Sequence, residues 1–461
     1  MKHPKTLMIF LLVAAALFGP FPARLDAAPR LVRVGVAIGV QSGTVESRNA
    51  IRCRDGNGNV FPAGSRATVE ASAGRMFVNG QPASLPLEFE GPGPLLWNGR
   101  AYRGTLRLVP HNRGFSVVNV LDVESYLRGV LKIEVNPAWP IESLKAQAVI
   151  ARTYALRQAG RHGSEGFDLC ATTHCQAYRG MSAEDPKLDR AIAETRGVVV
   201  FYGQSIAQTY YFADGAGWTA DVSTVWGGGI PYLTCRQEPV KYETPHSRWK
   251  ATLTQDTLQK IMSTLKMPVG TVLEIRATTR DQGNRVALLE VKGTAGTATV
   301  KGHSFRMAAG SNLIRSTLFD ISPSGRGVPV DGTPSRVPAP SAPSPLQAGE
   351  DPLVALTRQG VFSSTELMDM LLHPEKRGDY LKKALAGAGN PQPKPSSPPV
   401  PPIPTSSFAG SAPAAFEFQG RGWGHGVGFS QWGAKALSEN GWNFEAILGH
   451  YFPGTTLRMI P

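Results

Sequence analysis

A carboxylate set among apolar residues is the first candidate for chemistry in this chain. Glu134 lies close in sequence to Leu131, Ile133, Val135 and Trp139. Burial against hydrocarbon and an indole ring penalises the charged form of a carboxyl and raises its pKa. Cleavage of a glycosidic bond requires an acid that keeps its proton near neutral pH. The residue types therefore favour a general acid at Glu134.

Two other carboxylates compete with Glu134, and a structural role competes with a catalytic one. Glu124 follows a predicted strand in a polar setting. Glu142 falls in the first turn of a predicted helix, where a negative charge favours the helix dipole. Glu134 itself could cap the turn or pair with Lys132 or Lys145. From residue types alone these alternatives stay open.

The elements that position Glu134 follow from the pattern around it. We expect a strand over Phe115–Leu121, a short helix, a turn with Pro137 and Pro140, and a longer helix from about Pro140 to Gly160. Apolar residues recur in the longer helix at helical spacing. They predict a buried stripe of Leu144, Ala148, Ala151 and Ala155.

The whole chain predicts an α+β fold, with a mixed β-rich scaffold, a helical catalytic segment and a Pro-rich insertion. Residues 29–118 show short alternating runs between Gly, Asn and Pro turns, and we expect strands there. Residues 119–321 form the predicted catalytic core. Residues 322–415 are rich in Pro, Ser and Gly, with short helices between, and predict an insertion inside one fold. The Gly-rich residues 416–461 return to the core.

Composition and the first residues indicate where the protein works. Lys2 and Lys5 precede an apolar run over Leu7–Leu17, and small residues follow up to Ala28, as in an export signal. We expect residues 1–28 to be cleaved, with an uncleaved anchor as the alternative. The mature chain would be exported to the periplasm or cell envelope, peripheral to a membrane at most. The formal net charge of +13 suits an anionic wall polymer, and we see no nucleic-acid-binding motif.

Two thiols and two histidines form the second candidate site. His162, Cys170, His174 and Cys175 lie in one short segment. Zinc accepts mixed Cys and His ligands in a tetrahedral set. We expect Cys170 and Cys175 to be ligands, together with His162 or His174. The alternatives are free buried thiols or a disulfide between the two cysteines, since export leads to an oxidising compartment.

A glycine-rich loop near the end of the chain is the third candidate. Repeated glycines in Gly420–Gly433 imply unusual backbone conformations or a close approach to a ligand. Aromatic rings there could stack on sugars, while a packing loop with a structural His425 is the alternative. Upstream, Tyr210–Ala213 suggests core packing, with Asp214 and Trp226 as candidate groove residues. Three histidines have no partner in the sequence pattern: His111, His246 and His303.

Three of these segments resemble, in the same order, the motifs of the SpoIID/LytB family, which acts on bacterial cell-wall peptidoglycan. The segment from Val118 to Leu156 matches a family pattern in three parts. The pattern begins V-N-x-x-x-x-E-x-Y-L-x-G-V, continues with a catalytic Glu and a proline, and ends with E-[AS]-L-K-A-Q-A-V-x-A-R-T-Y-A-L. The cysteine segment resembles the C-x-C-Q-x-Y-type motif. The glycine loop resembles G-x-G-x-G-H-G-V-G-x-S-Q-x-G-A. One departure is an extra residue between Glu134 and Pro137, where the family has Glu-Met-Pro.

The resemblance implies a peptidoglycan lytic transglycosylase that cleaves the MurNAc–GlcNAc bond with one acid/base, Glu134, and leaves 1,6-anhydroMurNAc ends. It also implies zinc, which is associated with some members, and a preference for glycan stripped of peptide stems. Expected partners are glycan strands and a cell-wall amidase. A non-catalytic amidase enhancer or wall-binding protein is the alternative function. Expected substrate-binding residues are Gln147, Arg152, Tyr154, Gln176, Tyr178, Trp423, His425, Ser430 and Gln431.

Overall fold

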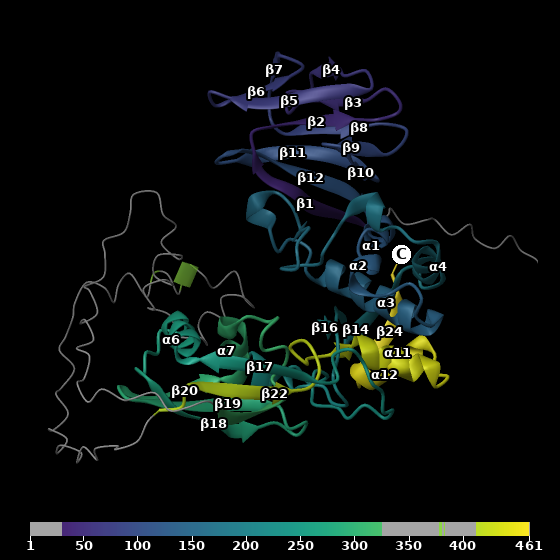
Figure 1. The fold of residues 1–461 in the computed structure, drawn as a ribbon. Coiled ribbons are helices and arrows are strands. Elements are labelled where there is room, and N and C mark those ends of the chain that lie inside the picture. The colour runs from purple at the N-terminus through teal and green to yellow at the C-terminus, as the bar shows by residue number, and fades with distance from the viewer. Residues whose placement is uncertain (1–29, 325–377, 380–381, 383–411, 461) are drawn as a thin grey trace, which may run out of the picture. The chain divides into compact units, whose positions relative to one another are not determined.

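The computed structural model describes residues 30–324, 378–379, 382 and 412–460 (Figure 1). The predicted export signal at residues 1–28 and most of the predicted insertion at 322–415 lie outside the described residues. Helices and strands both occur along the described chain, in several sheets, which confirms the predicted α+β class. Among the described residues, no helix has the length and apolar character needed to cross a membrane.

The N-terminal part of the described chain forms two sheets. Their orders are β13-β1-β12-β11-β8-β3-β4 and β10-β9-β2-β5-β6-β7, antiparallel except for the β1–β13 pair. The strands are β1 (Leu31–Val40), β2 (Ser42–Glu46), β3 (Arg52–Arg54), β4 (Val60–Pro62), β5 (Arg66–Ser72), β6 (Arg75–Val78), β7 (Gln81–Ala83), β8 (Leu87–Glu90), β9 (Leu95–Trp97), β10 (Arg100–Tyr102), β11 (Thr105–His111), β12 (Gly114–Asp122) and β13 (Leu169–Cys170). The predicted strand-rich region is therefore confirmed.

A group of helices follows β12. They are α1 (Val123–Arg128), α2 (Leu131–Glu134), α3 (Ile141–Arg157) and α4 (Pro186–Glu194), with short 3-10 turns η1 (Gly163–Glu165) and η2 (Gly180–Ala183). The side chain of Asp122 caps α1, and Asp185 caps α4. Helix α4 begins at Pro186, because the Asp185 cap and a proline at the first position define its start.

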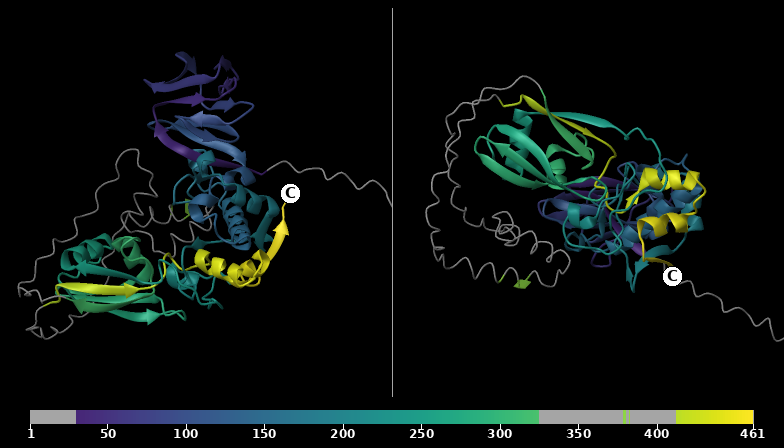
Figure 2. Two further views of the ribbon diagram at one scale, coloured as in Figure 1. Left: turned by 45° about the vertical axis from the view of Figure 1, so that its right-hand side comes forward. Right: turned by 90° about the horizontal axis from the view of Figure 1, so that it is seen from below.

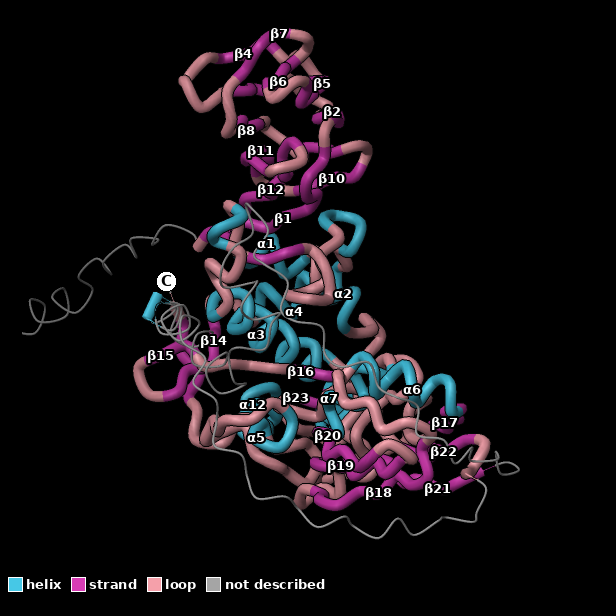
Figure 3. Tube along the Cα trace, turned by 90° about the vertical axis from the view of Figure 1, so that its left-hand side faces the viewer, coloured by secondary structure: helices cyan, strands magenta, loops and turns pink. Residues whose placement is uncertain are grey.

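Helix α3 is buried on more sides than its sequence suggested. The four residues of the predicted stripe are all buried, but so are most other residues of the helix. Helices α1, α4, α11 and α12 and strand β14 all contact it, and Figure 3 shows α4 beside it. The alanines of α3 allow these neighbours to approach closely. A central helix of this kind can position side chains from several elements at once.

The segments after α4 return to α3. Strand β14 (Val198–Tyr202) pairs with β15 (Ser205–Ile206) and β24 (Thr456–Met459), and β16 (Tyr211–Phe212) pairs in parallel with β23 (Phe429–Ser430). Helix α5 (Val222–Val225) is short. Helices α11 (Gln431–Glu439) and α12 (Phe444–Tyr451) contact each other, as Figure 2 shows in yellow.

A third group of strands has its own core. Strands β17 (Trp249–Thr254), β22 (Ala415–Gly420) and β21 (Phe319–Ser324) form one sheet, and β18 (Val272–Arg280), β19 (Val286–Gly293) and β20 (Gly296–Lys301) form another. Helices α6 (Gln255–Thr264) and α7 (Gly302–Ala309) belong to this group. Ser324 pairs with Ala415, so the chain leaves and re-enters the described structure on neighbouring strands.

Candidate active site

The turn after α2 accommodates the extra residue before the proline. Glu134 is the last residue of α2, and Val135 continues in an extended conformation. The side chain of Asn136 accepts a hydrogen bond from the Ala138 N–H at 2.9 Å, and the Trp139 N–H donates to the Asn136 carbonyl at 3.0 Å. The insertion is thus absorbed after the helix, within a turn that Asn136 closes.

Glu134 is half-buried and meets neutral hydrogen-bond donors. Its carboxyl group accepts hydrogen bonds from the Tyr211 hydroxyl and the Ala177 backbone N–H. Burial raises the pKa of Glu134 above its ordinary value, and the two hydrogen bonds oppose that shift without cancelling it. The alternative, in which Glu134 pairs with Lys132 or Lys145, is contradicted, because both lysines have other partners. Lys132 lies 4.0 Å from Asp185, and Lys145 lies 2.7 Å from both of its carboxylate partners, Glu142 and Glu194.

A chain of buried hydrogen bonds positions Tyr211. Gln176 donates from Nε2 to the Tyr211 hydroxyl and to the Ala151 carbonyl, each at 3.3 Å, and accepts at Oε1 from the Tyr126 hydroxyl at 3.1 Å. Burial raises the pKa of Tyr211 well above its usual value, so the phenol keeps its proton. With Gln176 as its donor, the Tyr211 hydroxyl can direct its own proton to Glu134.

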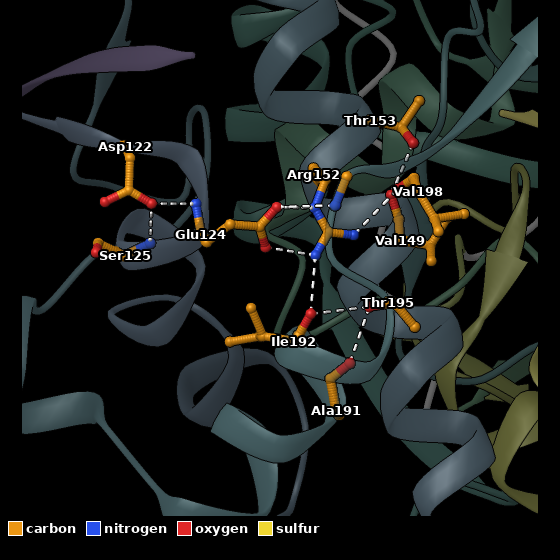
Figure 4. A network of polar contacts seen from close by, with 11 residues as sticks. Asp122, Glu124, Ser125, Val149, Arg152, Thr153, Ala191, Ile192, Thr195 and Val198 are labelled. Atoms are coloured by element: carbon orange, nitrogen blue, oxygen red, sulfur yellow. Dashed lines mark hydrogen bonds and ion pairs between the residues drawn. The ribbon is translucent and has the colours of Figure 1, made fainter. Parts of the chain in front are cut away.

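Glu124, the rival carboxylate, belongs to a buried ion pair (Figure 4). Arg152 donates from Nε and Nη2 to the two carboxylate oxygens of Glu124 at 2.9 and 2.6 Å. The same guanidinium donates to the carbonyls of Val198 and Ile192. Arg152 is 0% exposed, which contradicts the prediction that it contacts substrate. Its contacts instead join α1, α3, α4 and β14.

Most of the other predicted substrate-binding residues are also buried. Tyr178 donates to Asn119 at 2.7 Å, and Ser430 caps α11 by accepting from the Gly433 N–H at 3.2 Å. Contact with substrate stays a prediction for these residues; the buried ones are Gln147, Tyr154, Gln176, Tyr178, Ser430 and Gln431. Trp423 and His425 are half-buried and keep exposed surface.

His425 is held by its own loop and by aromatic rings. Its Nδ1 accepts from the Val427 N–H at 3.0 Å, and its ring lies 4.9 Å from that of Trp226 and 5.5 Å from that of Phe212. Burial lowers the pKa of His425 to about 3, so the ring is neutral at physiological pH. Asp214, a candidate groove residue, is only 1% exposed, so that expectation is wrong.

A row of rings connects the turn after Glu134 to the glycine-rich loop. Trp139 lies 5.0 Å from Trp432, Trp432 lies 6.4 Å from His246, and His246 lies 4.6 Å from Trp423, between ring centroids. The sequence pattern gave His246 no partner. Its place in this row comes from residues far apart in the chain.

The predicted zinc ligands come together, and both histidines take part. One ligand atom each from His162, Cys170, His174 and Cys175 all lie within 4.8 Å of one another. The Sγ–N distances between cysteines and histidines are 3.5 to 3.7 Å. Two ligands at ordinary zinc distances and the tetrahedral angle would be about 3.6 Å apart. The donor set and its spacing therefore fit a tetrahedral zinc ion.

The surroundings of this cluster also resemble a metal site. Glu165 lies 2.6 Å from Nδ1 of His162, which leaves Nε2 directed toward Cys175. Cys170 and Cys175 are free thiols in the structure. The Arg161 guanidinium lies 3.1 Å from Nε2 of His174; metal binding through Nδ1 would put a proton on Nε2 and require Arg161 to move. Cys175 directly precedes Gln176 and Ala177, so the cluster adjoins the partners of Glu134.

Sequence reasoning missed two functional residues. The sequence pattern places Tyr211 among packing residues, because its hydroxyl partner is distant in sequence. Glu165, three positions after His162, had a local signal, since a carboxylate at that spacing can reach the ring.

Comparison with known proteins finds a family and several relatives that this chain resembles. Residues 111–202 match the family described as stage II sporulation protein, SpoIID. The chain is 26% identical over 393 residues to the amidase enhancer of Bacillus subtilis (strain 168), covering 78% of this chain and 48% of that protein. It is 27% identical over 212 residues to stage II sporulation protein D of the same organism, covering 43% of this chain and 60% of the relative.

An uncharacterised protein of Brachyspira hyodysenteriae (strain ATCC 49526 / WA1) is 38% identical over 146 residues, covering 32% of this chain and 40% of that protein. The chain thus spans about half the length of the curated relatives it matches. The family match includes Glu134 and the Cys/His cluster.

Proposed function

Because the chain belongs to the SpoIID/LytB family, we propose that it is a peptidoglycan lytic transglycosylase with Glu134 as its acid and base. The observation that carries the proposal is the environment of Glu134. The carboxyl has a raised pKa, and the groups that shift it are burial, Tyr211 and Ala177. Among the described residues, no second carboxylate is part of that set. A hydrolase would need a paired carboxylate, whereas a lytic transglycosylase needs one.

Glu134 gives up one proton and later accepts a different one, so the carboxyl ends the reaction protonated again. The protonated carboxyl gives its proton to the oxygen of the MurNAc–GlcNAc bond, and the bond between that oxygen and MurNAc C1 breaks. Glu134, now a carboxylate, accepts the proton of the C6 hydroxyl of the same MurNAc as O6 bonds to C1. The Tyr211 hydroxyl and Ala177 N–H stabilise the carboxylate between these steps.

We also propose that His162, Cys170, His174 and Cys175 hold zinc. Four protein ligands would close the coordination sphere, which is typical of a structural site. A bound ion would supply a rigid cross-link, without an open position for substrate. This cross-link would fix the start of the segment that contains Gln176 and Ala177, and so the donors around Glu134.

The site of action follows from the same proposal. The protein would be exported to the cell envelope, bind glycan strands and work alongside a cell-wall amidase. The alternative is a non-catalytic enhancer, favoured by the similarity to an amidase enhancer over 78% of this chain.

Glu134→Gln separates these functions. Purified protein is incubated with intact and peptide-stripped sacculi, and the released fragments are analysed by mass spectrometry. We expect anhydro-ended fragments from the parent protein, and product formation lower by about 10²- to 10⁴-fold in the variant, with glycan binding retained. Equal product from the variant would refute the role of Glu134. Binding without product from either protein would favour the enhancer.

A further inference from the structure

A basic pocket lies on the β17–β22–β21 sheet. Its cavity has a volume of about 530 Å³ and is lined by Arg248, Lys250, Arg280, Arg421 and one acid, Asp320. Arg280 is paired with Asp320 at 2.9 Å, and Lys250 with Glu417 at 2.8 Å. The lining therefore has an excess of positive charge, which favours an anionic ligand.

Two guanidinium groups in this pocket have no carboxylate partner among the described residues. Arg248 and Arg421 are both exposed. Trp249 pairs with Gly420 across the antiparallel strands, so one position further Arg248 stands opposite Arg421. The backbones stay adjacent there, because the Gly422 N–H donates to the His246 carbonyl at 2.9 Å. Like charges in directly opposed positions destabilise a sheet, unless an anion lies between them.

Trp249, between Arg248 and Lys250, faces the core instead of the arginines. Side chains alternate between the two faces of a strand, and Trp249 is buried while its two neighbours are exposed. Its indole packs over Gly420, where a Cβ would collide with the ring, and lies 6.2 Å from the Phe319 ring between centroids. Gly420 and Trp249 thus hold the two strands together beneath the charged groups.

The pocket is joined to the Glu134 site by a short path. Trp423, two residues after Arg421, exchanges backbone hydrogen bonds with Asp214, and Tyr211 lies three residues before Asp214. The Cα atoms of Arg421 and Tyr211 are therefore at most about 24 Å apart. One polymer strand could contact both places.

We propose that this pocket binds carboxylate groups of peptidoglycan, as a second binding site for the strand that Glu134 cleaves. The planar guanidinium pairs with carboxylates through two parallel hydrogen bonds, and two adjacent guanidiniums suit such a group. In stripped glycan the carboxylates are on the lactyl groups of MurNAc; in intact peptidoglycan they are on the stem peptides. The inference rests on the proposed function for its substrate.

The test uses full-length protein in the Glu134→Gln background, so that strands stay intact. Arg248→Gln/Arg421→Gln is compared with Arg54→Gln/Arg75→Gln, which removes the same charge from exposed positions on β3 and β6. Binding is measured by co-sedimentation with sacculi freed of phosphate polymers, either intact or stripped of peptides. We expect the pocket variant to bind at least about tenfold more weakly, and the control to bind like the parent.

Amidation of the sacculus carboxyls should abolish the difference between the pocket variant and the parent. A deficit restricted to stripped sacculi would assign the lactyl carboxylates, and one restricted to intact sacculi the stem peptides. The proposed binding site would be refuted if both double variants lost the same amount of binding, or if the parent protein still bound amidated sacculi. Since binding is measured without turnover, a deficit in the pocket variant stands even if the protein with Glu134 releases no anhydro product, which would refute only the proposed function.

Discussion

Glu124 and Glu134 lie on consecutive short helices, yet their surroundings differ completely. Glu124 in α1 meets the buried guanidinium of Arg152, through two hydrogen bonds (Figure 4). Glu134 at the end of α2 meets a hydroxyl and a backbone N–H, and its pKa is raised by burial. A bidentate ion pair fixes the positions of the elements that carry it. A carboxyl with a raised pKa can instead exchange a proton.

Helix α3 serves both regions through adjacent residues. Arg152 binds Glu124, while the carbonyl of Ala151 accepts a hydrogen bond from Gln176, which in turn orients Tyr211. One helix thus sets the framework and the acid site in a common geometry. The comparison predicts that damage to the Glu124 region will change stability, and damage to the Glu134 region will change chemistry.

The largest expected effect on stability comes from Arg152→Met. The substitution leaves Glu124 buried without its cation, and breaking a buried pair in this way costs about 3–5 kcal/mol. Denaturant unfolding, followed by circular dichroism, measures the change. Arg157→Met is the matched control, since Arg157 lies exposed on the same helix and should change the free energy of unfolding little.

The double variant Glu124→Leu/Arg152→Met sharpens this test. Removing both partners leaves no uncompensated charge, so we expect it to be more stable than either single variant. Glu134→Gln should keep parental stability while product formation is lost. If Arg152→Met unfolded at the same denaturant concentration as the parent, or Glu134→Gln at a much lower one, the assignment of stability to the Glu124 region and chemistry to the Glu134 region would be wrong.

The next effect concerns the proposed zinc, which adjoins only the Glu134 side. Glu165→Gln removes the carboxylate that orients His162. Loss of such an outer partner weakens metal binding by about 10- to 100-fold. Competition with a chromophoric chelator measures the affinity. Product formation should fall at limiting zinc and recover when zinc is added.

Glu46→Gln is a matched control, because Glu46 pairs with an arginine on β5, away from the cysteines. A chelator should leave the Glu124–Arg152 region folded, with unchanged sensitivity to Arg152→Met. Protein that contains no metal, with Cys170 and Cys175 oxidised to each other, would instead support the disulfide alternative.

The fold class and the raised pKa of Glu134 could be predicted from local signals. Alternation marked the N-terminal strands, and helical spacing marked the stripe of α3, because both are properties of neighbouring residues. The apolar neighbours of Glu134 indicated a raised pKa, which the structure confirms in direction. The Cys/His segment also brought its ligands together within one short stretch.

The partners of these residues could not be predicted, because they are set by long-range contacts. The family resemblance places Arg152 at the substrate; only the packing of α1 against α3 places Glu124 beside it. Tyr211 reaches Glu134 from a strand 77 residues later in the chain. The basic pocket depends on the pairing of β17 with β22, on either side of the residues outside the described structure.

The smallest effect, Tyr211→Phe, tests the acid itself. Glu134 protonates the leaving oxygen only while it holds a proton, so the rate is full below its pKa and falls as the pH rises through it. The Tyr211 hydrogen bond favours the charged form and lowers the pKa of Glu134. Its removal should raise that pKa further and move the falling limb of the rate to higher pH, by on the order of one pH unit.

Rates of anhydro-product release across pH, with Tyr210→Phe as the control, measure this shift. Tyr210 is the adjacent residue, and its ring contacts Trp226 and His425 instead of the Glu134 carboxyl. The falling limb of the pH–rate profile of Tyr210→Phe should therefore coincide with that of the parent protein. A limb that moves to lower pH in Tyr211→Phe would mean that the hydroxyl stabilises the protonated acid. If the falling limb did not shift, it would report the titration of a group other than Glu134. The proposed difference in chemistry between Glu134 and Glu124 would then be wrong.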